Sequence, residues 1–490
     1  MNKGGNTQRR PFKQISLEGR FFDYLRKIER MVEKMEDTKI TTRKSLIIAS
    51  LIFGMLFGAG NLIFPIHLGQ LAGSHWLTAS SGFLISGVLI PLMALLAISI
   101  TRSNGIYDLA RPNGHYYALI FLILIHATLG PLFATPRTAT VPYEIGIASH
   151  LSSGANTIGL LIYSAIFFLL VYYFSSREAK ITTLIGKILN PLFLLMLFII
   201  FMLAFISPLG TTGTIASTAA YAQDAFSNGF LQGYNTMDGL AALAFGITVI
   251  SSIKALGIKR QRDVSLATAK SGMIGIAGVA IIYLCLIWLG ATSLHHFKIA
   301  DNGGTTLAQI AHYYLGTAGD AILATLATIT CLTTAMGLVV AFSQDFHRRF
   351  PRISYKTFLR FNCGLSFLFA NLGLNQIITW STPFLMFLYP LAITLIILGI
   401  TSPLFNNDAI VYKITTAFTL IPAFFDMANA LPAPLSNLAA IKAMLAFANQ
   451  YFPFFKLGFG WLSFGIIGMI LGLIIHFAKA SRSAALAGER

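Results

Sequence analysis

The chain contains a series of apolar runs, each about twenty residues long, separated by short polar segments. A helix needs about 20 apolar residues to cross the ~30 Å hydrocarbon core of a bilayer. Only 11% of the residues are charged, against roughly one quarter in soluble domains. The sequence therefore predicts an all-α integral membrane protein with about 12 transmembrane helices. They are expected at residues 45–67, 77–101, 116–141, 157–174, 182–206, 230–253, 271–293, 318–342, 358–372, 376–400, 411–428 and 457–478.

The basic residues indicate how the spans are oriented. Of the 35 Lys and Arg residues, 31 fall before the first span or in alternate segments, three fall in the intervening segments, and Arg137 lies inside a span. Cytoplasmic loops carry the excess of Lys and Arg, so this pattern predicts that both termini are cytoplasmic. The basic residues that give the net charge of +17 lie mainly in these cytoplasmic segments, so we do not expect nucleic acid as a partner.

Three parts of the chain are predicted: a basic cytoplasmic segment at residues 1–44, a polytopic domain at 45–478 and a cytoplasmic tail at 479–490. Two interpretations of the first part stay open. Residues 21–35 place apolar residues at helical spacing, which is typical of a surface helix. Alternatively, Met31 or Met35 is the natural start and the extension is dispensable.

The first span is interrupted beyond its middle by Gly58, Ala59, Gly60 and Asn61, before Pro65. An unwound turn at membrane depth survives only where it is buried in protein or lines a cavity. The sixth span has a similar interruption at residues 233–239, with the sequence GYNTMDG. Breaks in the first helix of two consecutive five-helix blocks predict an inverted repeat with a binding site between the breaks.

The same segments carry a family resemblance, through FGMLFGAGNLIFP at 53–65, LGQLAG at 68–73, GPLFATPRTATVPYEIG at 130–146, GYNTMDGLAALAFG at 233–246 and CLTTAMGL at 331–338. The chain from about residue 45 onward resembles the bacterial branched-chain amino acid:cation symporter family. The resemblance implies a leucine-transporter-like five-plus-five inverted repeat with broken helices 1 and 6, followed by two additional C-terminal helices. It also implies symport of leucine, isoleucine and valine with a monovalent cation through the bacterial inner membrane, and 45–478 would be the transporter domain.

The two breaks offer groups that suit a zwitterionic substrate. Half-helix N-termini present free amides to a carboxylate, and half-helix C-termini present carbonyls to an ammonium group or a cation. The spacing of Gly54 and Gly58 alone would also fit ordinary small-residue helix packing. The predicted substrate-binding residues are Leu56, Gly58, Ala59, Gly60, Asn61, Tyr234, Asn235 and Asp238. Phe53, Phe57, Phe64 and Phe245 are candidates for the wall of a side-chain pocket.

The resemblance also implies a sodium site. Related symporters hold the ion between the first and eighth helices, which corresponds here to backbone carbonyls of Gly54, Phe57 and Thr330 and the hydroxyls of Thr333 and Thr334. These neutral oxygens suit a hard cation. Taken alone, such threonines bond more often to their own helix. The resemblance outweighs this second reading, so sodium is favoured as the coupling ion, with a proton as the alternative. No cofactor is expected.

Charged residues at membrane depth are candidates for function because their burial is costly. Asp238 could accept the substrate ammonium, take up a proton or cap a half-helix. Glu144 follows Arg137 by two helical turns, so the two could pair as a lock or gate. We expect Asp426, near a helix end, to be solvated.

The sequence gives little support to other functions. It contains no phosphate-binding loop of the GxxxxGK[ST] type, so neither a nucleotide partner nor an ATP-driven pump is expected. An ion-coupled carrier for another small neutral solute stays an alternative, and a channel is a weaker one because no filter motif occurs. The dispersed histidines show neither a metal spacing nor a nucleophile–base set, so we do not expect an enzyme.

Overall fold

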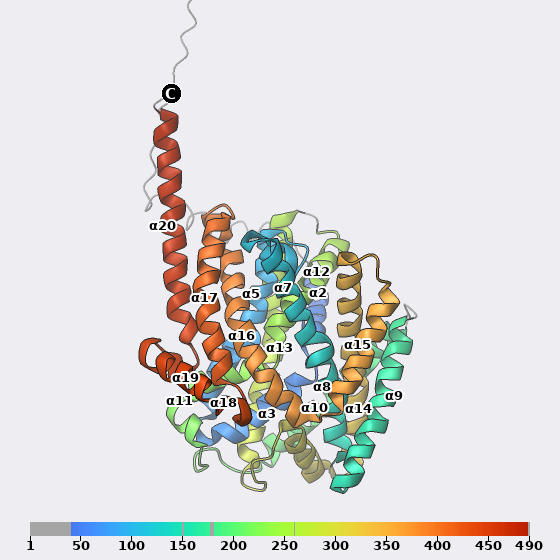
Figure 1. Cartoon of the computed structure of the whole chain (residues 1–490). Helices are drawn as coiled ribbons and strands as arrows, with labels where there is room; N and C mark the ends of the chain where they lie inside the picture. Colours follow the sequence, from blue (N-terminus) through green and yellow to red (C-terminus); the bar gives the residue numbers. More distant parts are fainter. Residues whose placement is uncertain (1–40, 149–150, 177–180, 259, 489–490) are drawn as a thin grey trace, which may run out of the picture. The chain divides into compact units, whose positions relative to one another are not determined.

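The computed structural model describes residues 41–148, 151–176, 181–258 and 260–488, and residues 43–490 form one compact unit. Most of the predicted N-terminal segment, with both interpretations of it, lies outside the described residues. In the described ranges the backbone is helical and contains no β-strand (Figure 1). The predicted all-α class is therefore confirmed. The main helices are α2 (Thr42–Leu56), α3 (Gly60–Ala72), α4 (Trp76–Leu84), α5 (Ile90–Thr101), α6 (Ile106–Ala110), α7 (His115–Ala127), α8 (Ala134–Gly146), α9 (Ser153–Ser176), α10 (Ile181–Ile206), α11 (Ala219–Tyr234), α12 (Asp238–Ala255), α13 (Gln261–Ser293), α14 (Gly303–Arg349), α15 (Tyr355–Ala370), α16 (Leu374–Thr401), α17 (Ala409–Asn429), α18 (Ala433–Ser436), α19 (Ala439–Tyr451) and α20 (Gly460–Gly488).

Each predicted span corresponds to a helix or a pair of helices. By length and composition, nine helical stretches in the described part could cross a membrane, one of which joins α3, α4 and α5. Three predicted spans are not among these nine. The first is broken, and α15 has only 16 residues. The fifth corresponds to α10, of which residues 192–206 count as a shorter apolar helix.

Both predicted breaks are present. The first helix ends at Leu56 and restarts at Gly60, and the sixth ends at Tyr234 and restarts at Asp238. At the second break, Met237 adopts a left-handed conformation with φ of 62°. Each break therefore interrupts its helix for three residues, 57–59 and 235–237.

Two helix crossings bring the backbones of the two five-helix blocks into close contact. Helix α3 packs on α13, and α11 packs on α4. In the first crossing, a methyl group on Gly69 would lie 2.0 Å from the Ile287 carbonyl oxygen. In the second, a methyl group on Gly82 would lie 2.1 Å from the Phe226 carbonyl oxygen. Because only glycine allows this approach, one half of each broken helix packs its backbone closely on a span of the other block.

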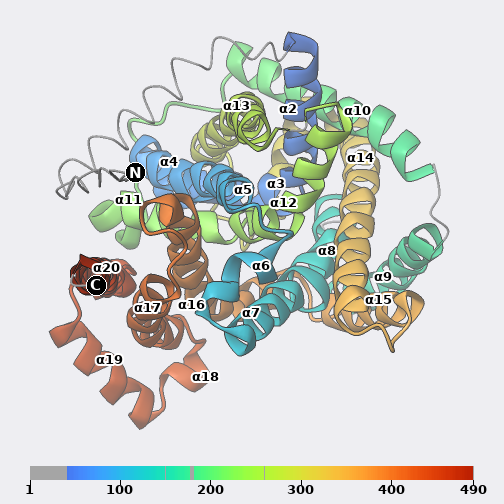
Figure 2. The ribbon, with the colours of Figure 1, turned by 90° about the horizontal axis from the view of Figure 1, so that it is seen from above.

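The helices after the repeat lie at one edge of the bundle. Helix α17 packs along α20 and also contacts α16, and the two views show α17, α19 and α20 together at this edge (Figures 1 and 2). Helix α20 continues to Gly488.

The expectation that Asp426 is solvated is wrong. Its side chain is buried with 1% exposure, because the start of α20 covers it. A methyl group on Gly460 would lie only 3.1 Å from Asp426 Oδ1. The C-terminal end of α17 is therefore not exposed to solvent, since the first residues of α20 pack against it.

Candidate functional site

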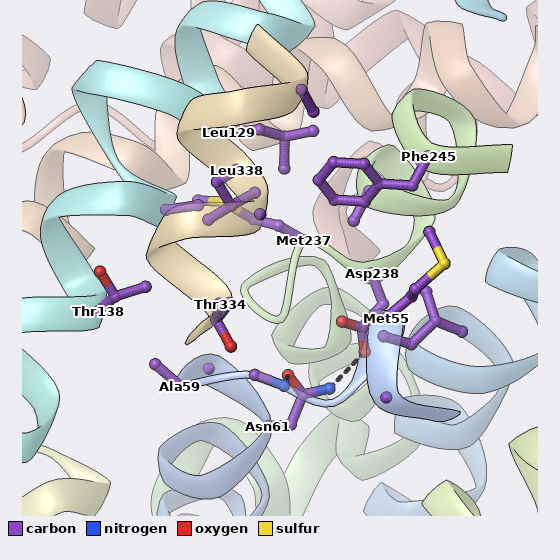
Figure 3. Close-up of a pocket in the computed structure, with 18 of the residues that line it drawn as sticks. Met55, Ala59, Asn61, Leu129, Thr138, Met237, Asp238, Phe245, Thr334 and Leu338 are labelled. Carbon is purple, nitrogen blue, oxygen red and sulfur yellow. Dashed lines mark hydrogen bonds between the residues drawn. The ribbon is translucent and has the colours of Figure 1, made fainter. Parts of the chain in front are cut away.

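A cavity of about 440 Å³ lies between the two breaks and the eighth span (Figure 3). Its walls come from α2, α3, α8, α12 and α14, together with the residues of the breaks and Leu129. Met55, Phe245 and Leu338 give the cavity apolar surface, whereas Asn61, Asp238 and Thr334 give it polar groups. This mixture suits a small ligand that has an apolar part and a charged part.

A hydrogen-bond network joins the two breaks. Asn61 Nδ2 donates to Asp238 Oδ2 at 2.8 Å, as the dashed line in Figure 3 shows. The same amide contacts the hydroxyl of Tyr283 in α13, which donates to Asp238 Oδ2 at 2.6 Å. The exposed fractions are 2% for Asn61, 3% for Asp238 and 0% for Tyr283. Because these bonds are buried, they hold the two broken helices and the seventh span in one arrangement.

The first break leaves backbone groups without helical partners. Gly58 N–H donates to Asn61 Oδ1 at 2.9 Å instead of continuing the helical ladder of α2. Asn61 and Leu62 N–H groups make turn bonds of 3.2 and 3.3 Å. Among the described hydrogen bonds, the N–H groups of Ala59 and Gly60 have none, so these two amides remain open to an anionic ligand.

The threonines of α14 lie directly against the first break. A methyl group on Gly58 would lie 3.3 Å from Thr334 Cγ2 and 3.9 Å from Thr334 Oγ1. The hydroxyls of Thr333 and Thr334 donate to the Thr330 carbonyl at 2.7 and 3.2 Å. Three oxygens therefore gather beside the break, with the hydroxyls bonded to their own helix as isolated threonines commonly are. In the part of the chain that the structure describes, no group of three or more His, Cys, Asp or Glu side chains could hold a metal ion.

Most of the predicted site residues line this one cavity. Those in its wall are Gly54, Leu56, Gly58, Ala59, Gly60, Asn61, Asp238, Thr333 and Thr334. Four others lie behind the wall: Phe57, Tyr234, Asn235 and Thr330. Tyr234 stacks on Tyr389 of α16 with ring centroids 4.1 Å apart, and Asn235 Nδ2 donates to Gln232 Oε1 at 3.1 Å. Their side chains therefore shape the second break from outside the cavity.

The predicted Arg137–Glu144 pair does not form. Arg137 Nη1 donates to the carbonyl oxygen of Asn235 at 2.8 Å, on the side of the second break. Glu144 Oε1 accepts from Asn302 Nδ2 at 3.2 Å and from the Thr305 hydroxyl at 3.3 Å. Two helical turns separate the residues along α8, and each bonds to residues outside α8 instead.

Two residues that bond to the wall of the cavity had no signal in the sequence. Tyr283 is one of 17 tyrosines and lies in an otherwise ordinary apolar span. Ser381 of α16 bonds to Arg137, and the sequence does not distinguish it from the nearby hydroxyls of Thr379 and Thr382. Of the four phenylalanines considered as pocket walls, Phe245 lines the cavity and Phe64 lies beside Arg137. The sequence pattern therefore predicts the breaks, but it does not predict which residues of other helices contact the site.

Two facing broken helices with a cavity between them define the class of a membrane carrier built on an inverted repeat. In a comparison with solved structures, Mhp1, a nucleobase-cation-symport-1 family transporter, matches with a TM-score of 0.55 at 13% identity, over 90% of this chain and 93% of Mhp1. This likeness confirms the predicted leucine-transporter-like fold.

The family follows from sequence comparison. Residues 41–479 match the model of the branched-chain amino acid transport protein family. The permease BrnQ of Lactobacillus delbrueckii subsp. lactis is 43% identical over 86% of this chain and 95% of that protein. The permease BraB of Bacillus subtilis is 35% identical over 89% of this chain and 96% of that protein. The chain belongs to the branched-chain amino acid transport protein family, and it is a transporter rather than an enzyme.

Proposed function

We propose that the protein takes up leucine, isoleucine and valine through the bacterial inner membrane by symport with a monovalent cation, sodium in preference to a proton. The observation that carries this proposal is the cavity at the two breaks, which combines apolar walls with backbone and side-chain groups for both charges of an amino acid. The named relatives, which are branched-chain amino acid permeases, support the substrate class.

The substrate would lie across the two breaks. Its carboxylate would meet the open amides of Ala59 and Gly60 at the start of α3, where the helix dipole favours negative charge. Its ammonium group would meet the carboxylate of Asp238. The branched side chain would face Met55, Phe245 and Leu338, where each buried methylene contributes ~0.8 kcal/mol. A pocket of this kind accepts all three branched side chains because one methylene changes the affinity little.

The sodium ion would lie between the end of α2 and the threonines of α14. The carbonyls of Gly54, Phe57 and Thr330 and the hydroxyls of Thr333 and Thr334 would then form its oxygen cage. The short distance between Gly58 and Thr334 supports this position. Each cation that enters is worth ~2.3 kcal/mol per 100 mV of membrane potential, enough to drive accumulation of a neutral zwitterion.

We also place both termini in the cytoplasm, as the distribution of Lys and Arg suggests. On this orientation the cavity extends from the breaks toward the cytoplasm. Its wall includes Leu51 of α2, Thr248 of α12 and Gln344 of α14, each on the side of the break that leads to a basic loop or terminus. The conformation described here would then be the inward-facing one, ready to release substrate.

The sodium site is tested by the variant Thr334→Ala. Removal of one oxygen from the cage should raise the sodium concentration for half-maximal leucine uptake by about tenfold, since a hydrogen bond or ligand to a charged group is worth about 1.5–3 kcal/mol. The matched control is Thr325→Ala in the same helix, where the exposed hydroxyl donates to Ala321 O at 2.7 Å. An unchanged sodium dependence in Thr334→Ala would reject the proposed ion site.

A further inference from the structure

Arg137 of α8 is a buried cation in the wall of the cavity, and 2% of its surface is exposed. Its Nη1 donates to the Asn235 carbonyl at 2.8 Å, and its Nη2 donates to the hydroxyl of Ser381. The guanidinium also lies over the ring of Phe64, 5.0 Å from the centroid. All three of these partners are uncharged.

The positive charge of Arg137 is therefore not compensated by a neighbouring anion. Within the described residues, no carboxylate oxygen lies within 4.0 Å of the guanidinium, and the buried Nε has no hydrogen-bond partner. A guanidinium carries five N–H donors in a planar fork that matches a carboxylate. An unpaired buried charge costs several kcal/mol, so a bound anion would relieve this cost.

The cavity has one more ionisable residue among the described residues of its wall, which is Asp238. Both charged residues lie at the second break. Arg137 of α8 bonds to the carbonyl of Asn235, and Asp238 follows Asn235 by three residues at the start of α12. The cavity thus presents one cation and one anion to a ligand. This pattern matches a zwitterion, in which a carboxylate and an ammonium group share one carbon atom.

We propose that Arg137 binds the carboxylate of the transported amino acid, while Asp238 binds its ammonium group. This inference rests on the proposed function and adds a specificity-determining residue to it. One carboxylate oxygen would accept from the amides of Ala59 and Gly60, and the other would accept from the unused N–H groups of Arg137. Selection for the α-carboxylate would then come from a full charge as well as from backbone dipoles.

The test compares leucine with two analogues that each lack one charge. The first is 3-methylbutan-1-amine, which lacks the carboxylate, and the second is 4-methylpentanoate, which lacks the ammonium group. Dissociation constants are measured for each ligand alone with purified protein. In Arg137→Gln, leucine and 4-methylpentanoate should bind at least about tenfold more weakly, as expected for the loss of one partner of a close charge pair. The amine should bind unchanged or more tightly, because a like charge is removed.

A purely structural role for Arg137 would give a different result. The control Ser381→Ala removes one bond to Arg137 but keeps the positive charge, so it should weaken leucine binding less than Arg137→Gln does. If Arg137→Gln weakened leucine and the amine equally, the inference would be overturned. Should Arg137→Gln not fold, Arg137→Lys offers the same comparison: a smaller selective loss for leucine supports the inference, and an equal loss rejects it. Wild-type protein that bound none of the three ligands would overturn the proposed function as well.

Discussion

Asp238 has a narrower role in the structure than its position in the sequence suggests. The sequence is compatible with three roles: acceptor of the substrate ammonium, proton carrier and cap of a half-helix. Its Oδ2 accepts from Asn61 of α3 and from Tyr283 of α13, so the carboxylate joins other helices to the second break. Because Asp238 also lines the cavity, the roles of ammonium acceptor and proton carrier fit this geometry better than that of a cap.

The variant Asp238→Asn separates these two roles. The substituted amide can still accept from Asn61 through its oxygen, but it lacks the charge. We expect leucine to bind about 10- to 100-fold more weakly, which corresponds to about 1.5–3 kcal/mol for a hydrogen bond to a charged group. The control is Asp224→Asn, at an exposed position of α11. Unchanged leucine affinity together with a lost pH dependence of uptake would favour the proton carrier instead.

Gly60 offers a second test at the scale of one residue. A methyl group here would lie 3.4 Å from the ring of Phe64 and 3.4 Å from the carbonyl oxygen of Thr236, which is ordinary contact. Gly60→Ala should therefore keep most of the transport activity. Gly60→Leu extends further, into the space between the breaks, and should abolish leucine uptake while the protein still inserts in the membrane. Normal uptake by Gly60→Leu at wild-type expression would show that the substrate does not bind at the first break.

At the scale of helices, local chemistry was enough to predict both breaks. Glycine and asparagine are weak helix formers, so the polar, glycine-containing segments 58–61 and 233–239 stand out within the apolar spans. The partners of these breaks could not be predicted, because Tyr283 and Ser381 reach them through tertiary packing. The prediction of an Arg137–Glu144 pair was wrong for the same reason. It rested on the spacing of the two residues along one helix, whereas their actual partners lie outside that helix.

The close helix crossings at glycine also cannot be predicted from the periodicity of the sequence, since each crossing joins residues far apart in the chain. A single methyl group should disturb one of them. In Gly290→Ala, the new carbon would lie 1.9 Å from the Ile66 carbonyl oxygen, so α3 and α13 must separate. Overpacking of this kind costs typically 1–3 kcal/mol. We expect a lower melting temperature in detergent for Gly290→Ala.

A matched control for this variant is Gly364→Ala in α15, where a methyl group would have no heavy atom within 4 Å. Alanine is also the better helix former by about 0.8–1.0 kcal/mol. The control should therefore keep or raise the melting temperature. Equal melting temperatures for Gly290→Ala and the wild type would contradict the tight crossing of α3 and α13.

In the whole molecule, the cavity lies on one side of the two breaks. The cavity reaches from the breaks past Thr248 and Gln344, whereas the opposite halves of the broken helices pack on α4 and α13 through glycines. Alternating access would require those packed halves to separate while α2 and α12 close the present opening. The buried bonds of Asn61, Asp238 and Tyr283 lie where the two movements meet, so substrate binding there can bias the conformation.

The most direct measurement is leucine accumulation by the purified protein in proteoliposomes under one imposed gradient at a time. With an inward sodium gradient, no pH gradient and an interior negative potential, we predict that labelled leucine accumulates above its external concentration. Unlabelled isoleucine and valine should compete with it, and replacement of sodium by choline should abolish accumulation. Accumulation in sodium-free vesicles under a pH gradient alone would contradict sodium coupling, and no accumulation under either gradient would contradict the assignment as an ion-coupled carrier of branched-chain amino acids.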